Sequence, residues 1–238
     1  MLKSLLIVCL AGLLPLFTGA QKLMKIVYVK DGIITGNAKE ANMLIAFRSV
    51  NGLYERNDYT MNGPLRRVKT FKDTKQAVLE GNYLEYNKNG NLVMAGYYFD
   101  NEKSGTWYYY NDSGRIIKTE EFHGRGIFDD NTAAPKGDTL IMPYYRNGKN
   151  EWRSYIFNTL NEDAIARNQL KNEQVKISFL IAETGKIKDL ILIKSEYFSF
   201  DNDVIKIISN AKGWNPASIG DKKVAYRLAQ TVSMVDAF

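Results

Sequence analysis

The sequence reads Glu80-Gly-Asn-Tyr-Leu-Glu-Tyr-Asn-Lys-Asn-Gly-Asn-Leu-Val93 and, 24 residues further on, Ser104-Gly-Thr-Trp-Tyr-Tyr-Tyr-Asn-Asp-Ser-Gly-Arg-Ile-Ile117. In each copy aromatic residues alternate along a short segment. An Asn-x-x-Gly step then turns the chain, because Asn and Gly tolerate the left-handed backbone of such a turn. Each copy is therefore predicted to be a β-hairpin. One hairpin cannot bury its aromatic face, so the copies are expected to join one longer sheet.

Weaker copies of this pattern lie upstream, at Tyr54-Glu-Arg56, Tyr59–Gly63 and Val68–Asp73. The region of hairpins is therefore predicted to span residues 21–128. From Gly81 to Phe122 it resembles the MORN-type repeat, in the variant found in exported and antitoxin-like bacterial proteins. The resemblance implies a sheet of stacked hairpins, and such repeats have been linked to lipid and protein binding.

The aromatic residues of these hairpins are a candidate ligand surface. Alternation along a strand sends Trp107 and Tyr109 to one face of the sheet, and Tyr108 and Tyr110 to the other. The competing interpretation is that the rings pack the sheet itself, since aromatic residues are favoured in strands. The hypothetical surface consists of Tyr83, Tyr86, Tyr97, Trp107, Tyr108 and Tyr110.

Residues 129–150 are polar and rich in turn-forming residues, which predicts a linker. A helix is expected over Glu151–Leu160, where apolar residues recur at helical spacing. Two strands, Val175–Ala182 and Ile187–Ser195, follow around a tight turn. The next expected elements are a helix capped by Asp201-Asn-Asp203 and a long strand over Val224–Met234. The predicted fold class is therefore α+β, with a ββαβ domain over residues 151–238 and its preceding helix.

This C-terminal stretch resembles the C-terminal domain of TonB, the periplasmic energy transducer of double-membraned bacteria. The resemblance rests on the strand from Val175, the turn Glu183-Thr-Gly-Lys186 and the Trp214-Asn-Pro-Ala217 motif. It assigns structural roles to Gly185 in the turn, to Trp214 as an indole that closes the core, and to Pro216. With hairpin repeats before it, the chain resembles exported proteins of the Bacteroidetes type, often called TonB-related.

The N-terminus has the pattern of a secretory signal peptide over residues 1–20. Lys3 precedes an apolar run, Leu5–Leu16, and the small residues Thr18-Gly-Ala20 follow. The run is too short for a typical transmembrane helix. An uncleaved membrane anchor and a lipoprotein, through Cys9, are the alternatives. The mature chain is therefore expected in the periplasm, and it lacks the long Pro-rich spacer of a true TonB.

Composition argues against an enzyme. Cys9 is the only cysteine and lies in the signal, and His123 is the only histidine, so sites built on several thiolates or imidazoles are excluded. No phosphate-binding loop or nucleophile motif occurs. The net charge is +6, with the charges interspersed. We expect no enzymatic activity, no metal, no cofactor and no nucleic-acid partner.

The sequence and both resemblances predict a non-enzymatic periplasmic binding or adaptor protein. It would recognise an extended peptide, from a TonB-dependent receptor, a TonB-system component or another envelope protein, by adding it as a strand to the last strand of the chain. An alternative is that this strand pairs with a second copy. Another alternative is a structural envelope module that binds glycan, lipid or peptidoglycan through the aromatic hairpins. The predicted peptide-binding residues are Val224, Tyr226, Arg227, Leu228, Gln230 and Val232.

Overall fold

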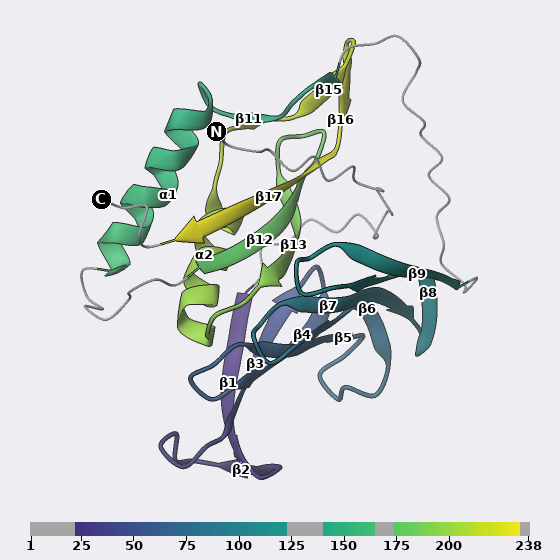
Figure 1. The fold of residues 1–238 in the computed structure, drawn as a ribbon, viewed down its shortest axis with the longest axis vertical. Coiled ribbons are helices and arrows are strands. Elements are labelled where there is room, and N and C mark those ends of the chain that lie inside the picture. Colours follow the sequence, from purple (N-terminus) through teal and green to yellow (C-terminus); the bar gives the residue numbers. More distant parts are fainter. Residues whose placement is uncertain (1–21, 123–139, 165–173, 234–238) are drawn as a thin grey trace.

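The structure is a computed structural model that describes residues 22–122, 140–164 and 174–233 of the 238 residues. The predicted signal peptide, His123 and the first half of the predicted linker lie outside the described residues. The described elements form two main parts, a large β-sheet and a C-terminal part that contains both helices (Figure 1).

Nine strands form one antiparallel sheet in the order β2-β1-β3-β4-β5-β6-β7-β8-β9. From β3 onward each strand pairs with its neighbour in the sequence, so the sheet is a meander. Residues 80–117 supply β6, β7, β8 and the start of β9, which confirms the predicted hairpins. The strands are β1 (Lys22–Lys30), β2 (Ile33–Thr35), β3 (Met43–Val50), β4 (Leu53–Thr60), β5 (Leu65–Phe71), β6 (Leu79–Tyr86), β7 (Leu92–Phe99), β8 (Glu102–Tyr110) and β9 (Ile116–Phe122).

The two Asn-x-x-Gly turns have the expected left-handed glycines. Gly90 has φ 77° and Gly114 has φ 75°. In the first turn the N–H of Gly90 donates to the carbonyl oxygen of Asn87 at 3.1 Å, and the equivalent bond to Asn111 in the second turn is 2.9 Å. The repeated sequence therefore produces a repeated turn geometry.

The C-terminal part contains a three-stranded sheet in the order β13-β12-β17, with two helices on one of its faces (Figure 1). Its elements are α1 (Lys149–Ala164), β12 (Gln174–Ile181), β13 (Ile187–Lys194), α2 (Phe198–Asn210) and β17 (Tyr226–Ser233). The predicted helix over Glu151–Leu160 is confirmed, and Trp152 and Ile156 on its apolar face are buried. The helix α2 begins at Phe198 and not at a cap formed by Asp201 to Asp203, which are buried inside the helix.

Five short strands connect these elements. They form a three-stranded sheet in the order β10-β15-β16 and a two-stranded sheet of β11 and β14. Two of them lie within the predicted linker, so residues 140–145 pair with the region just after α2. The strands are β10 (Leu140–Ile141), β11 (Tyr144–Tyr145), β14 (Trp214–Asn215), β15 (Ala217–Ile219) and β16 (Lys222–Val224).

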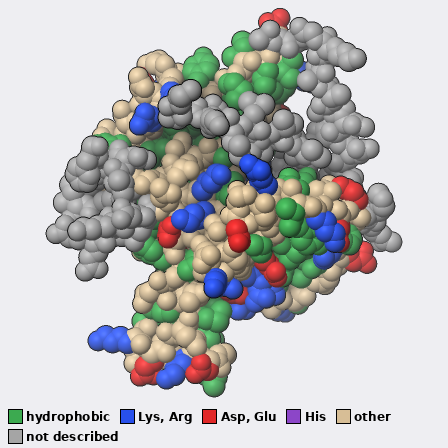
Figure 2. All heavy atoms as spheres, viewed as in Figure 1, with side chains coloured by type: hydrophobic (Ala, Val, Ile, Leu, Met, Phe, Trp, Pro, Cys, Tyr) green, Lys and Arg blue, Asp and Glu red, His purple; other side chains and the backbone are tan. Residues whose placement is uncertain are grey.

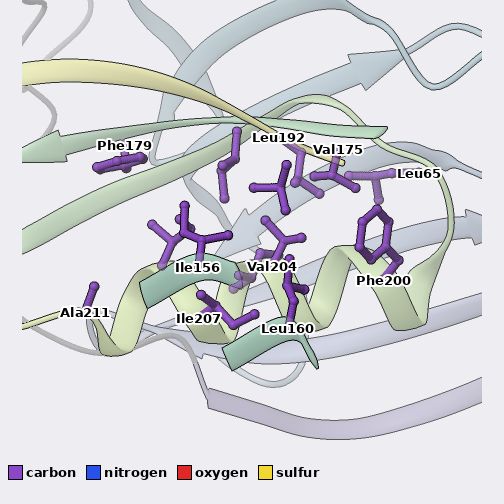
Figure 3. Close-up of a cluster of buried hydrophobic side chains, with 14 of the residues drawn as sticks. Leu65, Ile156, Leu160, Val175, Phe179, Leu192, Phe200, Val204, Ile207 and Ala211 are labelled. Carbon is purple, nitrogen blue, oxygen red and sulfur yellow. The ribbon is translucent and has the colours of Figure 1, made fainter. Parts of the chain in front are cut away.

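One hydrophobic core extends through both parts. It includes Leu65 of β5, Val175 of β12 and Phe200 of α2, each at most 1% exposed. Figure 3 shows Leu65 beside Phe200, with Val175 close by. The ring of Tyr59 in β4 packs edge-on against Phe198, with the ring centroids 5.4 Å apart. The helix α2 therefore lies against the large sheet as well as against its own sheet.

The predicted α+β class with a TonB-like ββαβ domain is wrong for the described residues. They are mostly β, with two helices, and a nine-stranded antiparallel sheet dominates the fold. The physical reason is that the segments predicted as linker and coil around α1 and α2 form strands by pairing with each other.

Candidate binding edge

The strand β17 lies at one edge of the sheet β13-β12-β17. It pairs with β12 over eight consecutive residue pairs, from Gln174↔Ser233 to Ile181↔Tyr226. Within the described residues, no strand pairs with its other side. About half of the backbone N–H and C=O groups of an edge strand point away from its partner, so β17 offers these groups to a further strand.

The opposite edge, β13, is connected to the large sheet. Its last residue, Lys194, forms a β-bridge with Asn91, and the N–H of Ser195 donates to the carbonyl oxygen of Gly90 at 2.9 Å. The Tyr86 hydroxyl donates to the carbonyl oxygen of Leu192 at 2.8 Å. Of the two edges of this sheet, β17 is therefore the one for which the described residues show no such contact to the large sheet.

Arg227 is the only charged residue of β17, and it turns toward the neighbouring strands. Its guanidinium donates to the Ser178 hydroxyl at 3.2 Å and to the Asp189 carbonyl oxygen at 3.1 Å, and it also forms an ion pair with the Asp189 carboxylate. Asp189 has φ 46° and also accepts a hydrogen bond from Asn82 in the large sheet at 3.3 Å. Charged side chains on an edge normally oppose pairing, and here the charge is engaged elsewhere.

The other predicted peptide-binding residues are in different surroundings. Tyr226, Leu228, Gln230 and Val232 lie opposite buried β12 residues, on the face that the helices cover. Val232 is 3% exposed, and the Gln230 side chain accepts a hydrogen bond from the Trp152 indole at 3.2 Å. Side chains on this face anchor the strand, so the edge itself would bind through its backbone.

Val224 lies in β16, which pairs with β15, and is therefore not part of the edge. The sequence predicted one strand over Val224–Met234, but β16 ends at Val224 and β17 begins at Tyr226. Ala229 and Thr231 were not predicted as site residues, although they are exposed on β17 beside the open edge. Their small side chains, at alternate positions of the strand, are the signal that could have identified them.

Two of the six predicted aromatic surface residues are buried. Trp107 is fully buried, since its ring lies against Gly96 and is surrounded by Tyr83, Tyr98 and Phe122 at centroid distances of 5.7, 5.2 and 6.1 Å. The ammonium of Lys103 lies 4.2 Å from its centroid. Trp107 therefore serves the packing of the sheet.

Tyr86 is also buried, at 4% exposure. The other predicted residues, Tyr83, Tyr97, Tyr108 and Tyr110, are half-buried. Register places Tyr108 and Tyr97 on one face of the sheet, and Tyr83 on the face of Trp107. Burial raises the pKa of Tyr83, Tyr97 and Tyr110 to about 12. The structure therefore does not gather these rings on one surface.

The three predicted motif residues are close together. Gly185 has φ 75°, and a Cβ atom there would lie 2.3 Å from the carbonyl oxygen of Trp214 and 3.9 Å from Pro216. The Trp214 ring packs against Trp152, Tyr145 and Phe179, with centroids 4.8, 5.5 and 5.9 Å away. This group holds the β12–β13 turn against the segment that follows α2.

A buried polar cluster joins α2 to the large sheet. The Ser195 hydroxyl donates to the Asp201 carboxylate at 2.5 Å and accepts from the backbone N–H of Leu65 at 2.8 Å. The N–H of Glu196 donates to the other Asp201 oxygen at 3.1 Å. Burial raises the pKa of Asp201 to about 7, against its hydrogen bonds, which lower it. The Tyr59 hydroxyl is near this carboxylate but lacks hydrogen-bonding geometry.

A second buried polar pair, Arg48 and Glu55, lies opposite across β3 and β4. Glu55 accepts a hydrogen bond from Asn57 at 2.9 Å, and burial raises its pKa against the influence of Arg48. Within the described residues, Nε and Nη2 of Arg48 have no hydrogen-bond partner. Arg48 is 1% exposed and Glu55 7%, so neither side chain is open to a ligand from solvent.

The described residues contain no group of three or more His, Cys, Asp and Glu placed to hold a metal ion. None of the described helices is long and apolar enough to cross a membrane. On the face shown in Figure 2, Lys and Arg side chains are intermixed with Asp and Glu over the large sheet. The edge of β17 is therefore the candidate binding site.

No family model, no curated protein and no solved structure matches this chain. The resemblances to MORN-type repeats and to the TonB family therefore stay predictions from the sequence.

Proposed function

We propose that the protein is a non-enzymatic binding or adaptor protein of the periplasm that recognises an extended peptide by strand addition to β17. The observation that carries this proposal is the edge itself: eight consecutive residues of β17 pair with β12 on one side and with no described strand on the other. Backbone hydrogen bonds would give affinity, and alternate side-chain positions would give selectivity.

Three features support β17 as a stable template. Val232 lies in the core, and the Gln230 side chain accepts a hydrogen bond from Trp152 of α1. The strand is therefore held in place before a ligand binds. Arg227 is turned toward Asp189, so its charge is neutralised. Ala229 and Thr231 leave room beside the edge because they are small. A preformed edge lowers the conformational cost of binding.

The periplasmic location and a partner from the TonB system rest on the sequence pattern and the resemblance. The alternative of a glycan- or lipid-binding aromatic surface has less support, since Trp107 and Tyr86 are buried. Pairing of β17 with a second copy uses the same edge, and it would compete with a peptide.

The experiment has two stages. A phage-displayed library of random decapeptides is panned against the chain from Gln21 to Phe238, and hydrogen exchange is then measured with a selected peptide. Strand addition should slow exchange at alternate amides of residues 226–233. A peptide that binds without slowing exchange there, or that protects β6 to β8 instead, contradicts the proposal.

Two proline variants, Ala229→Pro and Gln230→Pro, give a matched control. The N–H groups of these neighbouring residues point to opposite sides of the strand, so one faces β12 and the other faces outward. In the variant whose N–H faces outward, the chain should stay folded by circular dichroism and lose peptide binding. In the other, proline removes a bond to β12 and should destabilise the fold. Full peptide binding by the folded outward variant would count against strand addition.

A further inference from the structure

The face of the small sheet away from the helices has two lysines next to each other. Register places Lys194 of β13 directly opposite Lys176 of β12, and Lys176 directly opposite Thr231 of β17. These three residues form a row across the sheet that ends at the open edge. Like charges directly opposite each other on neighbouring strands are unfavourable.

Two other cations of this face, Lys194 and Arg227, are paired with carboxylates. Lys194 forms an ion pair with Glu196 at 2.7 Å, and Arg227 forms one with Asp189. Among the described residues, Lys176 forms no ion pair and no side-chain hydrogen bond. The row therefore has one positive charge that lacks a counter-charge, on the strand next to β17.

A strand added to β17 would place a side chain opposite Thr231, on the same face as Lys176. That position is two strand spacings from Lys176, or about 10 Å. A lysine stem reaches across a small neighbour, and a glutamate side chain extends from the other side, so the two charged groups can meet above Thr231. Because Thr231 is exposed and short, it leaves this path open.

We propose that the peptide bound at β17 carries an acidic residue, Glu or Asp, opposite Thr231. This inference rests on the proposed function, since it concerns the ligand of the same edge. The acidic side chain supplies the missing counter-charge of Lys176. The net charge of +6 also favours the approach of acidic ligands.

The acidic residue should change the affinity of the peptide only modestly, but selection from a library should still enrich it. An ion pair at an exposed site changes affinity about two- to fivefold. Replacement of the acidic residue of a selected peptide by its amide should weaken binding by this factor. The loss should shrink at high salt, because the interacting charges are exposed to solvent.

The test uses the same phage-displayed decapeptide library on four forms of the full chain. Wild type should enrich Glu or Asp at one position, and Lys176→Glu should enrich Lys or Arg at that position. Lys188→Glu is the matched control, since Lys188 is on β13, the strand furthest from β17, and it should select like wild type. Lys176→Gln is the conservative variant and should lose the preference without reversing it.

The outcomes separate the inference from the proposed function. Peptides that protect β17 in hydrogen exchange but show no acidic preference, or an unchanged one in Lys176→Glu, overturn the inference and leave strand addition standing. If no peptide is retained by wild type, strand addition fails and the acidic preference fails with it. Reversal in Lys176→Glu, with none in Lys188→Glu, supports both.

Discussion

The backbone of Gly90 lies directly against the backbone of Ser195. The Ser195 N–H donates to the Gly90 carbonyl oxygen at 2.9 Å, and a Cβ atom built on Gly90 would lie 2.1 Å from the Ser195 carbonyl oxygen. The two residues come from the turn between β6 and β7 and from the end of β13. Their contact fixes where the C-terminal part meets the large sheet.

Gly90→Ala should reduce the free energy of unfolding by about 3 kcal/mol or more, because the new methyl group meets Ser195 and Pro64. Gly114→Ala is the matched control: its φ of 75° nearly equals the 77° of Gly90, but its Cβ would meet nothing within 4 Å. It should lose only the left-handed penalty of about 1–2 kcal/mol. Urea unfolding measures both losses of unfolding free energy. Equal losses would show that the close approach to Ser195 does not contribute to the effect of Gly90→Ala.

The stability of the protein should fall as the pH rises toward 7. Burial raises the pKa of Asp201 to about 7 from its ordinary value of 3.8. The folded state therefore holds a proton that the unfolded state releases between these values. The contribution is complete below about pH 4 and is lost as the pH rises through about 7, and its full size is about 4 kcal/mol.

The check is urea unfolding of wild type and Asp201→Asn at several pH values between 5 and 8.5. The variant removes the titrating group, so its stability should decline less over this range. The difference between the two proteins then reports Asp201 alone. Parallel curves would mean that Asp201 has the same pKa in the folded and unfolded chains.

Arg227 and Asp189 should be energetically coupled. The ion pair is partly buried, with 26% and 15% of the two side chains exposed. We expect a coupling energy of about 1–3 kcal/mol from a double-mutant cycle of Arg227→Gln and Asp189→Asn, measured by urea unfolding. Asn is chosen because it tolerates the φ of 46° at this position. Additive losses would show that the two side chains act independently.

Substitutions at Gly96 and Trp107 should have non-additive effects on the free energy of unfolding, because the two residues are in close contact. A Cβ atom on Gly96 would lie 2.1 Å from the indole ring, and Trp107 is fully buried. Gly96→Ala alone should therefore destabilise the sheet, and Trp107→Leu alone should cost about 2–4 kcal/mol through the lost packing. The double variant should lose less than the sum, because the smaller side chain makes room for the methyl group.

The local part of the fold could be predicted from the sequence. Asn and Gly at fixed spacing, as in Gly90 and Gly114, marked the turns of the hairpins, and alternation marked β12 and β13. The fold class could not be predicted, because it depends on pairings between distant segments. Leu140 pairs with Ile219, and the Leu65 N–H bonds to Ser195 across 130 residues. No local pattern marks such partners.

The candidate site shows the same division. The sequence indicated a strand with few charges near the C-terminus, and β17 is such a strand. It did not indicate that the strand is interrupted between Val224 and Tyr226, because the interruption follows from the pairing of β16 with β15. Asp201 appeared as a helix cap in the sequence, while the structure buries it inside α2, where its carboxylate accepts a hydrogen bond from Ser195.

The connectivity of the strands has a consequence for the order in which the chain folds. From β3 to β9 each strand pairs with its neighbour in the sequence, so this part of the large sheet has a low contact order and can form early. The strand β12, in contrast, must wait for Tyr226–Ser233, about fifty residues later, before its second side is paired. The apolar residues Tyr59 and Leu65 of the large sheet likewise have no cover until α2, which lies later in the chain, packs against them. Because β17 is the last described strand of the chain, the strand addition proposed above would be restricted to molecules that have finished folding.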